Sequence, residues 1–320
     1  MKRFLIYSVL CMLSVLPACV TMRDCQIETL QPAKFTYSKD QVNHVALCAS
    51  PELLHNSILT NEIIEVMSTD SLIFNILYSL KQTWQSAPGC ENMNFTIIVS
   101  DQAPPTDLSF DMIVRLDRIL IRNSVYEEQF YSMEWEAFLQ SFYIAEWSLR
   151  DRDSQLIDIH AHRDMITWYS GLQKTKSEAR DSLPSVYNAW WDIGILAAKY
   201  YATRVSPHWQ KETRPIYLIP KDKELSEKAY SAMQNNGYER AFHIWEEMLI
   251  ASKKKGQKRR KGYLTYNMAV ARECQNLLDE AIQWSETSAK NSSNSINKDY
   301  LSRLKKRMLE REILDRQIAQ

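Results

Sequence analysis

Glycine is scarce in this chain. Only 6 of the 320 residues are Gly, against 16 Tyr and 9 Trp. Because glycine gives the backbone its greatest conformational freedom, so low a content disfavours a flexible or low-complexity chain. The composition instead predicts a well-packed helical or mixed protein, long enough for one large or two ordinary domains.

Net charge is absent as well, since 39 Lys and Arg are matched by 39 Asp and Glu. A balanced chain offers no broad attraction for phosphate backbones, so we expect no nucleic-acid partner. The cysteines include no CxxC pair, which leaves a zinc or thioredoxin-like site without support. Outside the N-terminal segment they are Cys25, Cys48, Cys90 and Cys274. Four cysteines allow three disulfide connectivities, which the sequence leaves open.

Catalytic motifs are also lacking. The sequence contains no GxSxG, no HExxH and no Walker or glycine-rich phosphate loop. Neighbouring carboxylates such as Glu246 and Glu247 fit ordinary charges on a helix. We therefore expect a protein that is not an enzyme and holds no cofactor.

The longest early apolar run is Phe4 to Leu16, which follows Lys2 and Arg3. A run of this length falls short of the ~20 residues of a membrane-spanning helix and is typical of a secretory signal. The next letters, "LPAC", resemble a bacterial lipobox. That resemblance implies cleavage after residue 18 and acylation of the Cys19 thiol, although Pro17 departs from the usual small residue.

Acylation would fix the chain to a membrane without a spanning helix, because each buried CH₂ contributes ~0.8 kcal/mol. We predict a signal peptide at 1–18, then the lipidated cysteine and a tether at 19–40. Val20 stands where Asp would signal inner-membrane retention in similar lipoproteins, and no acidic run follows. The resemblance implies an outer-membrane lipoprotein facing the periplasm, held in the lipid through Cys19.

Residues 41–220 are predicted to form a mixed α/β domain with a largely antiparallel sheet. Short apolar runs at 41–49 and 94–100 read as strands, and 69–85 between them has one apolar helical face. Longer extended runs follow at 108–122, 138–150 and 155–169, with a short polar turn that predicts an antiparallel hairpin between the last two. Residues 177–207 read as one long helix, with Pro184 in its first turn and Gly194 packed closely on the sheet.

Residues 221–320 are predicted to be all helical, which makes the fold class α+β. Two segments, from Lys223 and Lys261, share small and aromatic residues at matching places and resemble the tetratricopeptide repeat, whose period is ~34. The expected packing residues are Ala229, Gly237, Ala241, Trp245, Ala269, Ala281 and Trp284. Ala232 and Arg272 stand where that repeat has Tyr. A last helical pattern from Asn297 would cap the second repeat.

One segment has the residue types of a metal site. On a strand, Asp158, His160 and His162 share one face, and such side chains can bind zinc or copper. No fourth ligand is evident, and histidines on the outer face of a sheet are the commoner explanation. These three residues are weak candidates only.

The stretch "YATRVSPHWQKETRPIY", residues 201–217, is the most unusual segment of the sequence. With the helical segments after it, it resembles an uncharacterised family of Bacteroidota lipoproteins, through the residues Tyr201, Arg204, Pro207, Trp209, Arg214 and Tyr217. The resemblance implies a fold and a location but no catalytic residue. We interpret the stretch as an interdomain clasp, with both arginines stacked on Trp209, His208 or the tyrosines; the alternative is a ligand contact.

The sequence thus predicts an outer-membrane lipoprotein that binds a protein partner, or assists envelope assembly, through its helical repeats. One alternative is an envelope enzyme or metal-handling protein that uses Asp158, His160 and His162. Another is a glycan-binding lipoprotein that uses exposed Trp and Tyr side chains.

Overall fold

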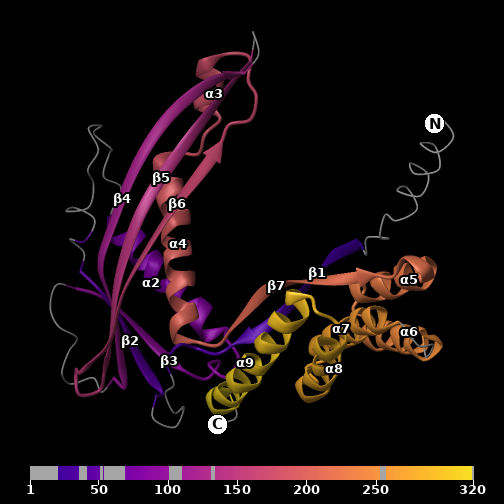
Figure 1. Ribbon diagram of the computed structural model, residues 1–320. Helices are drawn as coiled ribbons and strands as arrows, with labels where there is room; N and C mark the ends of the chain where they lie inside the picture. The colour runs from indigo at the N-terminus through magenta and orange to yellow at the C-terminus, as the bar shows by residue number, and fades with distance from the viewer. Residues whose placement is uncertain are drawn as a thin grey trace. The chain divides into compact units, whose positions relative to one another are not determined.

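Figure 1 shows the computed structural model, which describes residues 21–35, 42–50, 53, 69–100, 110–130, 134–252 and 257–318. The chain divides into two compact units. We call residues 32–208 with 313–320 the sheet unit, and residues 1–31 with 209–312 the helical unit. Cys19 and the predicted signal peptide lie outside the described residues.

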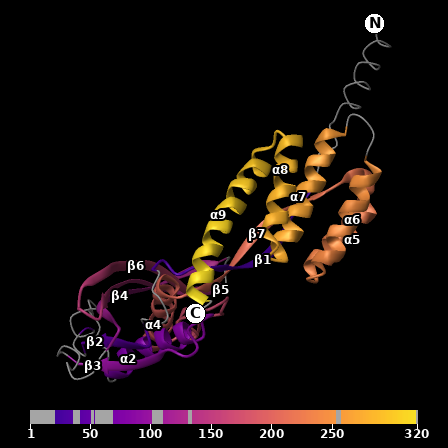
Figure 2. The same ribbon diagram turned by 90° about the horizontal axis from the view of Figure 1, so that it is seen from below.

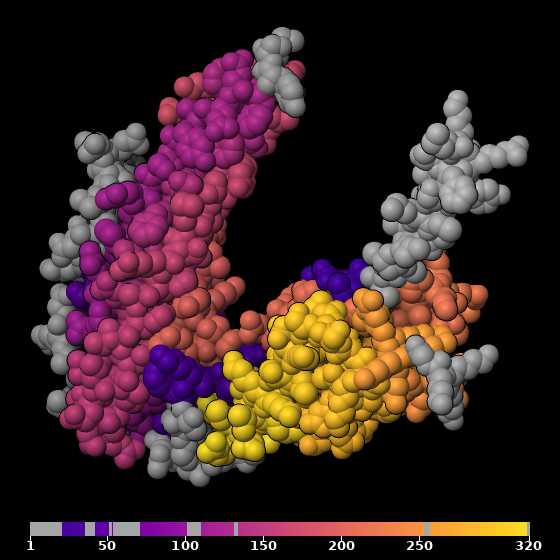
Figure 3. Space-filling model, viewed as in Figure 1, coloured from indigo at the N-terminus to yellow at the C-terminus, as the bar shows by residue number. Residues whose placement is uncertain are grey.

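The sheet unit is built on a five-stranded sheet with the order β3-β2-β4-β5-β6. Its strands are β2 (His44–Ala49), β3 (Asn94–Val99), β4 (Met112–Phe130), β5 (Glu134–Asp151) and β6 (Leu156–Tyr169). β2 runs parallel to β3 and β4, whereas β4, β5 and β6 are antiparallel neighbours. The predicted α+β class and the antiparallel hairpin of the last two strands are confirmed. In Figure 3 the C-terminal end of β4 and the N-terminal end of β5 form a projection of this unit.

Two helices build the core of the sheet unit. α2 (Thr69–Gln85) connects β2 to β3, and α4 (Val186–Val205) packs beside it. In Figure 2 the arc of β4 and β6 encloses α4. The apolar face predicted for α2 is fully buried against α4 and the sheet; it consists of Leu72, Ile73, Ile76, Leu77, Leu80 and Trp84.

The helix expected at 177–207 is in fact two helices. α3 (Lys176–Asp181) begins with a capping box of Thr175 and Glu178, and α4 begins only after Ser185 caps it. Pro184 therefore precedes the cap of α4 and lies outside its first turn. Gly194 packs on another helix, not on the sheet as predicted, because a Cβ there would lie 2.7 Å from Ile76 Cγ1 of α2.

The helical unit joins a two-stranded ribbon to a series of helices. The ribbon consists of β1 (Thr21–Gln31) and β7 (His208–Leu218), so the predicted tether at 19–40 contains a strand. The helices are η4 (Pro220–Asp222), α5 (Lys223–Gln234), α6 (Tyr238–Ala251), α7 (Lys258–Cys274), α8 (Leu278–Asn291) and α9 (Ser295–Ile318). None of the helices in the described part of the chain is both long and apolar enough to cross a membrane.

The turns of the two helical hairpins repeat every forty residues. Asn236 and Asn276 both adopt the left-handed conformation, with φ of 58° and 60°. In each turn the next amide donates to a carbonyl of the first helix, Gly237 to Ala232 at 2.8 Å and Leu277 to Arg272 at 2.9 Å. Asparagine tolerates this backbone better than most residues, and such a bond satisfies a carbonyl left open at a helix end.

Candidate functional site

The residues of the 201–217 stretch divide between two elements. Tyr201 and Arg204 lie in α4, Pro207 follows the helix, and Trp209, Arg214 and Tyr217 lie on β7. Each guanidinium lies over a ring of its own unit, Phe35 for Arg204 and Tyr300 for Arg214. The side chain of Trp209 is 61% exposed. The contacts of Arg204 thus lie within the sheet unit, and those of Arg214 lie within the helical unit.

Arg204 forms a buried ion pair with Asp158 of β6. Its Nη2 lies 3.0 and 2.9 Å from the two carboxylate oxygens, and its Nε donates at 3.2 Å. The Asp158 side chain is only 9% exposed. A planar guanidinium suits such two-point contact with a carboxylate, so this pair fixes the end of α4 on the sheet.

The weak metal candidates are engaged in other contacts. The rings of His160 and His162 stack on Tyr200 of α4, with centroids 5.8 and 3.5 Å away. Burial lowers the pKa of both imidazoles, which favours their neutral form. Asp158 already binds Arg204. Within the described ranges no group of three or more His, Cys, Asp or Glu side chains could hold a metal ion.

Tyr201 is a core residue. Its ring stacks on Trp147 of β5 with centroids 4.9 Å apart, and both side chains are fully buried. Burial raises the pKa of Tyr201 above its ordinary value. A side chain shielded this completely offers no surface to a ligand.

Arg214 lies in a second buried network, within the helical unit. Its Nε and Nη2 donate to Glu273 of α7 at 2.9 and 2.8 Å, and the Tyr300 hydroxyl of α9 donates to the same carboxylate at 2.8 Å. Arg307 also pairs with Glu273, and Glu212 pairs with Arg214. Burial alone would raise the pKa of Glu273, but hydrogen bonds and charge from Arg214, with the charge of Arg307, hold it below its usual range.

Strand β7 and the residues after it hydrogen bond through their backbone to side chains of the helices. The Asn267 side chain of α7 accepts from the Tyr217 amide at 2.9 Å and donates to its carbonyl at 2.8 Å. The Ser226 hydroxyl of α5 accepts from the Ile219 amide at 3.0 Å. The Tyr217 hydroxyl donates to Asn297, and burial raises its pKa to about 12. The ribbon therefore covers one face of α5 and α7.

Most of the residues predicted to pack the two repeats are buried. Ala229, Ala241, Ala269 and Ala281 are fully buried. Trp245 is also fully buried, but its equivalent forty residues later is Ser285, which is buried as well, and not the predicted Trp284. Trp284 is partly buried and contacts the Phe242 ring edge-on at 5.9 Å. Gly237 leaves little room for a side chain, because a Cβ would lie 3.2 Å from the Ala232 carbonyl oxygen.

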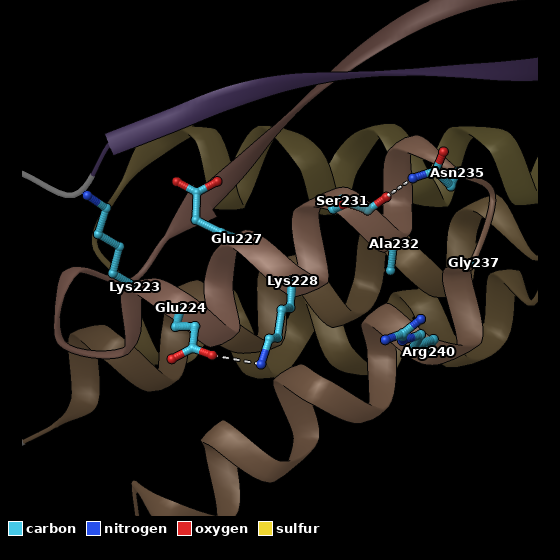
Figure 4. A pocket seen from close by; sticks show the side chains of 9 residues that line it. All are labelled: Lys223, Glu224, Glu227, Lys228, Ser231, Ala232, Asn235, Gly237 and Arg240. Atoms are coloured by element: carbon cyan, nitrogen blue, oxygen red, sulfur yellow. Dashed lines mark hydrogen bonds and ion pairs between the residues drawn. The ribbon is translucent and has the colours of Figure 1, made fainter.

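A hollow of the helical unit lies on α5 and the start of α6, and Figure 4 shows it. Its volume is about 780 Å³. The lining residues are Lys223, Glu224, Glu227, Lys228, Ser231, Ala232, Asn235, Gly237 and Arg240. We call this surface the α5–α6 groove.

Charges in the groove are only partly paired. Glu224 bonds Lys228 at 2.8 Å, and that hydrogen bond lowers the pKa of the Glu224 carboxyl. Glu227 pairs with Arg23 of β1 at 2.7 Å. Lys223 and Arg240 have no carboxylate partner among the described residues. The groove therefore holds two cationic groups that are free to meet an acidic partner.

The hollow arises from Ala232. Forty residues later its place is taken by Arg272, whose guanidinium lies 3.7 Å from the centre of the Phe242 ring and bonds Glu239 at 2.6 Å. A long side chain thus fills the space beside α7, whereas alanine leaves the same space beside α5 open. In the sequence, residues 232 and 272 both depart from the Tyr of the repeat pattern. That departure alone did not identify the groove as a binding site.

Two family comparisons match parts of the chain. Residues 227–306 match a family described as Domain of unknown function (DUF6340), and residues 106–217 match one described as Domain of unknown function (DUF8603). Each covers less than half of the chain. The matches are consistent with an uncharacterised family. Comparison with curated proteins found no match.

Solved structures give weak partial likenesses. One is described as a neuraminyllactose-binding hemagglutinin homolog from Helicobacter pylori, with 12% identity, coverage of 58% of this chain and 91% of that one, and a TM-score of 0.34. Another is rare lipoprotein B from Shewanella oneidensis (13%, 49% and 88%, TM-score 0.25). A third is a minor lipoprotein from Acinetobacter baumannii (10%, 51% and 88%, TM-score 0.24). Likeness at this level carries no argument about function.

Proposed function

We propose that the protein is an outer-membrane lipoprotein on the periplasmic side, whose helical unit binds a protein partner during envelope assembly. The anchor rests on the N-terminal sequence, in which a positively charged start, a short apolar run and "LPAC" precede Cys19. Binding, and not catalysis, is the proposed role.

The α5–α6 groove carries the binding part of the proposal. It is an open hollow on a helical hairpin, with Ala232 at its floor. At its sides lie Lys223 and Arg240, which have no carboxylate partner in the described part of the chain. Paired helices present such surfaces in tetratricopeptide-like repeats, and the forty-residue recurrence of the turns supports that comparison. The ribbon covers another face of α5 and α7, and the groove lies on a face of α5 that it leaves open.

The partner segment should be acidic and partly apolar. The intramolecular contact at the equivalent place offers a guide, because there Glu239 and Phe242 of α6 meet Arg272. A partner with an acidic residue for Arg240 and an apolar side chain over Ala232 would pair the cation and cover the floor of the groove. Groups of opposite charge would also accelerate encounter and fix its orientation.

Photo-crosslinking in living cells tests the groove. A photoreactive amino acid at Ser231 should yield one defined protein adduct, whereas the same group at Gln283, exposed on α8, should yield none. Adding Arg240→Glu should reduce the Ser231 adduct strongly, and Lys290→Glu on α8 should not. No adduct at Ser231, or equal adducts at both positions, would refute the groove as the binding surface.

Metabolic labelling tests the anchor separately. Cells fed an alkyne-bearing palmitate should incorporate it into the wild-type chain and not into Cys19→Ala, and the wild-type chain should sediment with outer membranes. Label that persists in Cys19→Ala would contradict acylation at this residue. A failed anchor would leave the groove proposal standing, since the two experiments share no residue.

A further inference from the structure

The solvent-facing side of α2 lacks the charges that such a surface usually carries. Ser71, Phe74, Asn75 and Tyr78 follow at i, i+3, i+4 and i+7, so they line one stripe opposite the buried face. No Asp, Glu, Lys or Arg occurs from residue 71 to residue 80. An outward helical stripe is normally charged or polar, and this one presents two aromatic rings instead.

These rings line a hollow with a third aromatic side chain. Phe74 and Tyr78 are 50% and 45% exposed, and their rings lie 6.2 Å apart and within 15° of parallel. Trp191 of α4 completes the wall, and the volume is about 480 Å³. That size lies within the range of small-molecule sites. All lining residues belong to the sheet unit, so this aromatic hollow is separate from the α5–α6 groove.

An amide at the hollow has no partner. The Nδ2 atom of Asn75 is buried and makes no hydrogen bond among the described residues. Leaving such a donor unsatisfied costs roughly 1–3 kcal/mol, which calls for a compensating role. The amide torsion of asparagine is soft, so a modest rotation would turn this donor toward a molecule in the hollow that Asn75 lines.

We propose that the aromatic hollow binds a neutral sugar ring. None of the described residues that line it is charged, so this lining selects neither an anion nor a cation. The C–H groups on one face of a pyranose pack on aromatic rings, while its hydroxyls need donors and acceptors such as the Asn75 amide and the Tyr78 hydroxyl. An acyl chain would use the rings but would leave the amide unsatisfied.

Titration with methyl glycosides tests the proposal. The mature chain with Cys19→Ser, labelled with ¹⁵N, is titrated with the methyl glycosides of glucose, galactose and N-acetylglucosamine. At least one should bind saturably and shift the Trp191 indole signal. Phe74→Ala and Tyr78→Ala should each weaken binding about tenfold or more. Trp209→Ala, an exposed tryptophan of the helical unit, should not.

Four outcomes would overturn the sugar site, and three of them concern the glycosides alone. They are an absence of saturable shifts with every glycoside, shifts that spare Trp191, and affinity unchanged in both alanine variants. A fourth is a shift of Trp191 by octanol without any by the glycosides, which would indicate an acyl-chain site. The Trp191 signal of the unmodified hollow decides the matter even where a variant fails to fold.

Discussion

At the residue scale, charge is buried where it completes a network. Glu273 is fully buried and receives hydrogen bonds from Arg214, Tyr300 and Arg307. In such an interior a carboxylate is tolerated only with these partners, and each partner in turn depends on it. The network joins β7, α7 and α9, three elements of the helical unit that are distant in sequence.

Loss of the Glu273 charge should be costly. Glu273→Gln leaves the Arg214 charge buried without full compensation, so the free energy of unfolding should fall by roughly 3–5 kcal/mol. Urea unfolding measures it. The matched control is Lys305→Gln, which breaks an exposed pair with Glu286 and should cost below ~1 kcal/mol. Equal small losses would show that the buried network contributes little.

Arg204 allows a comparison of charge with geometry. Arg204→Lys keeps the charge opposite Asp158 but loses the two-point contact, and Arg204→Ala removes both. We expect both variants to be destabilised in thermal unfolding, with alanine the worse by ~1 kcal/mol or more. If lysine matches the wild type, the contact is a simple charge pair and the two-point geometry is unimportant.

At the element scale, the contact of α2 with α4 depends on one missing side chain. Gly194→Ala would gain up to ~1 kcal/mol of helix propensity, but the clash with Ile76 should cost about 1–3 kcal/mol. A net loss of stability is expected. The double variant with Ile76→Ala should be less destabilised than the sum of the single variants. Asp192→Ala, exposed on α4, serves as the control and should change little.

The stacking of β6 on α4 should respond to acid. Burial lowers the pKa of His160 and His162 in the folded state, so the unfolded chain binds their protons more readily. Their contribution is full above the unfolded value near ~6.5 and declines as pH falls below it. Stability measured from pH 7.5 to 5 should fall less steeply in His160→Phe with His162→Phe than in the wild type.

At the scale of the whole molecule, the number of thiols distinguishes the processed forms. Cys25, Cys48, Cys90 and Cys274 form no disulfide with one another. Burial raises the pKa of Cys48 to about 11 and also raises that of Cys25 and Cys274, so native thiols should react slowly. Denatured protein from membranes should titrate as four thiols if Cys19 is acylated, and a fifth would contradict acylation.

Patterns within one element were readable from the sequence, and contacts between distant residues were not. The face of α2 follows from the spacing of its apolar residues alone. The apolar pattern from residue 177 to residue 207 predicted one continuous helix. The caps at Thr175 and Ser185 instead begin two separate helices. The partner of Arg214 is Glu273, 59 residues away, and no local signal singles it out among the acidic residues. Trp284 was paired with Trp245 because both are tryptophans. The residue forty positions after Trp245 is Ser285, so Trp284 is one position out of register with the repeat.

The ribbon sets an order for biogenesis. Thr29 of β1 hydrogen bonds Glu212 of β7, 183 residues later in the chain. The first strand to leave the ribosome must therefore remain without its partner until the sheet unit has been synthesised almost completely. So long a separation makes closure slow and leaves an unpaired edge at risk of aggregation. For β1, escort by a chaperone until β7 is synthesised would matter more than for any other described strand of this chain.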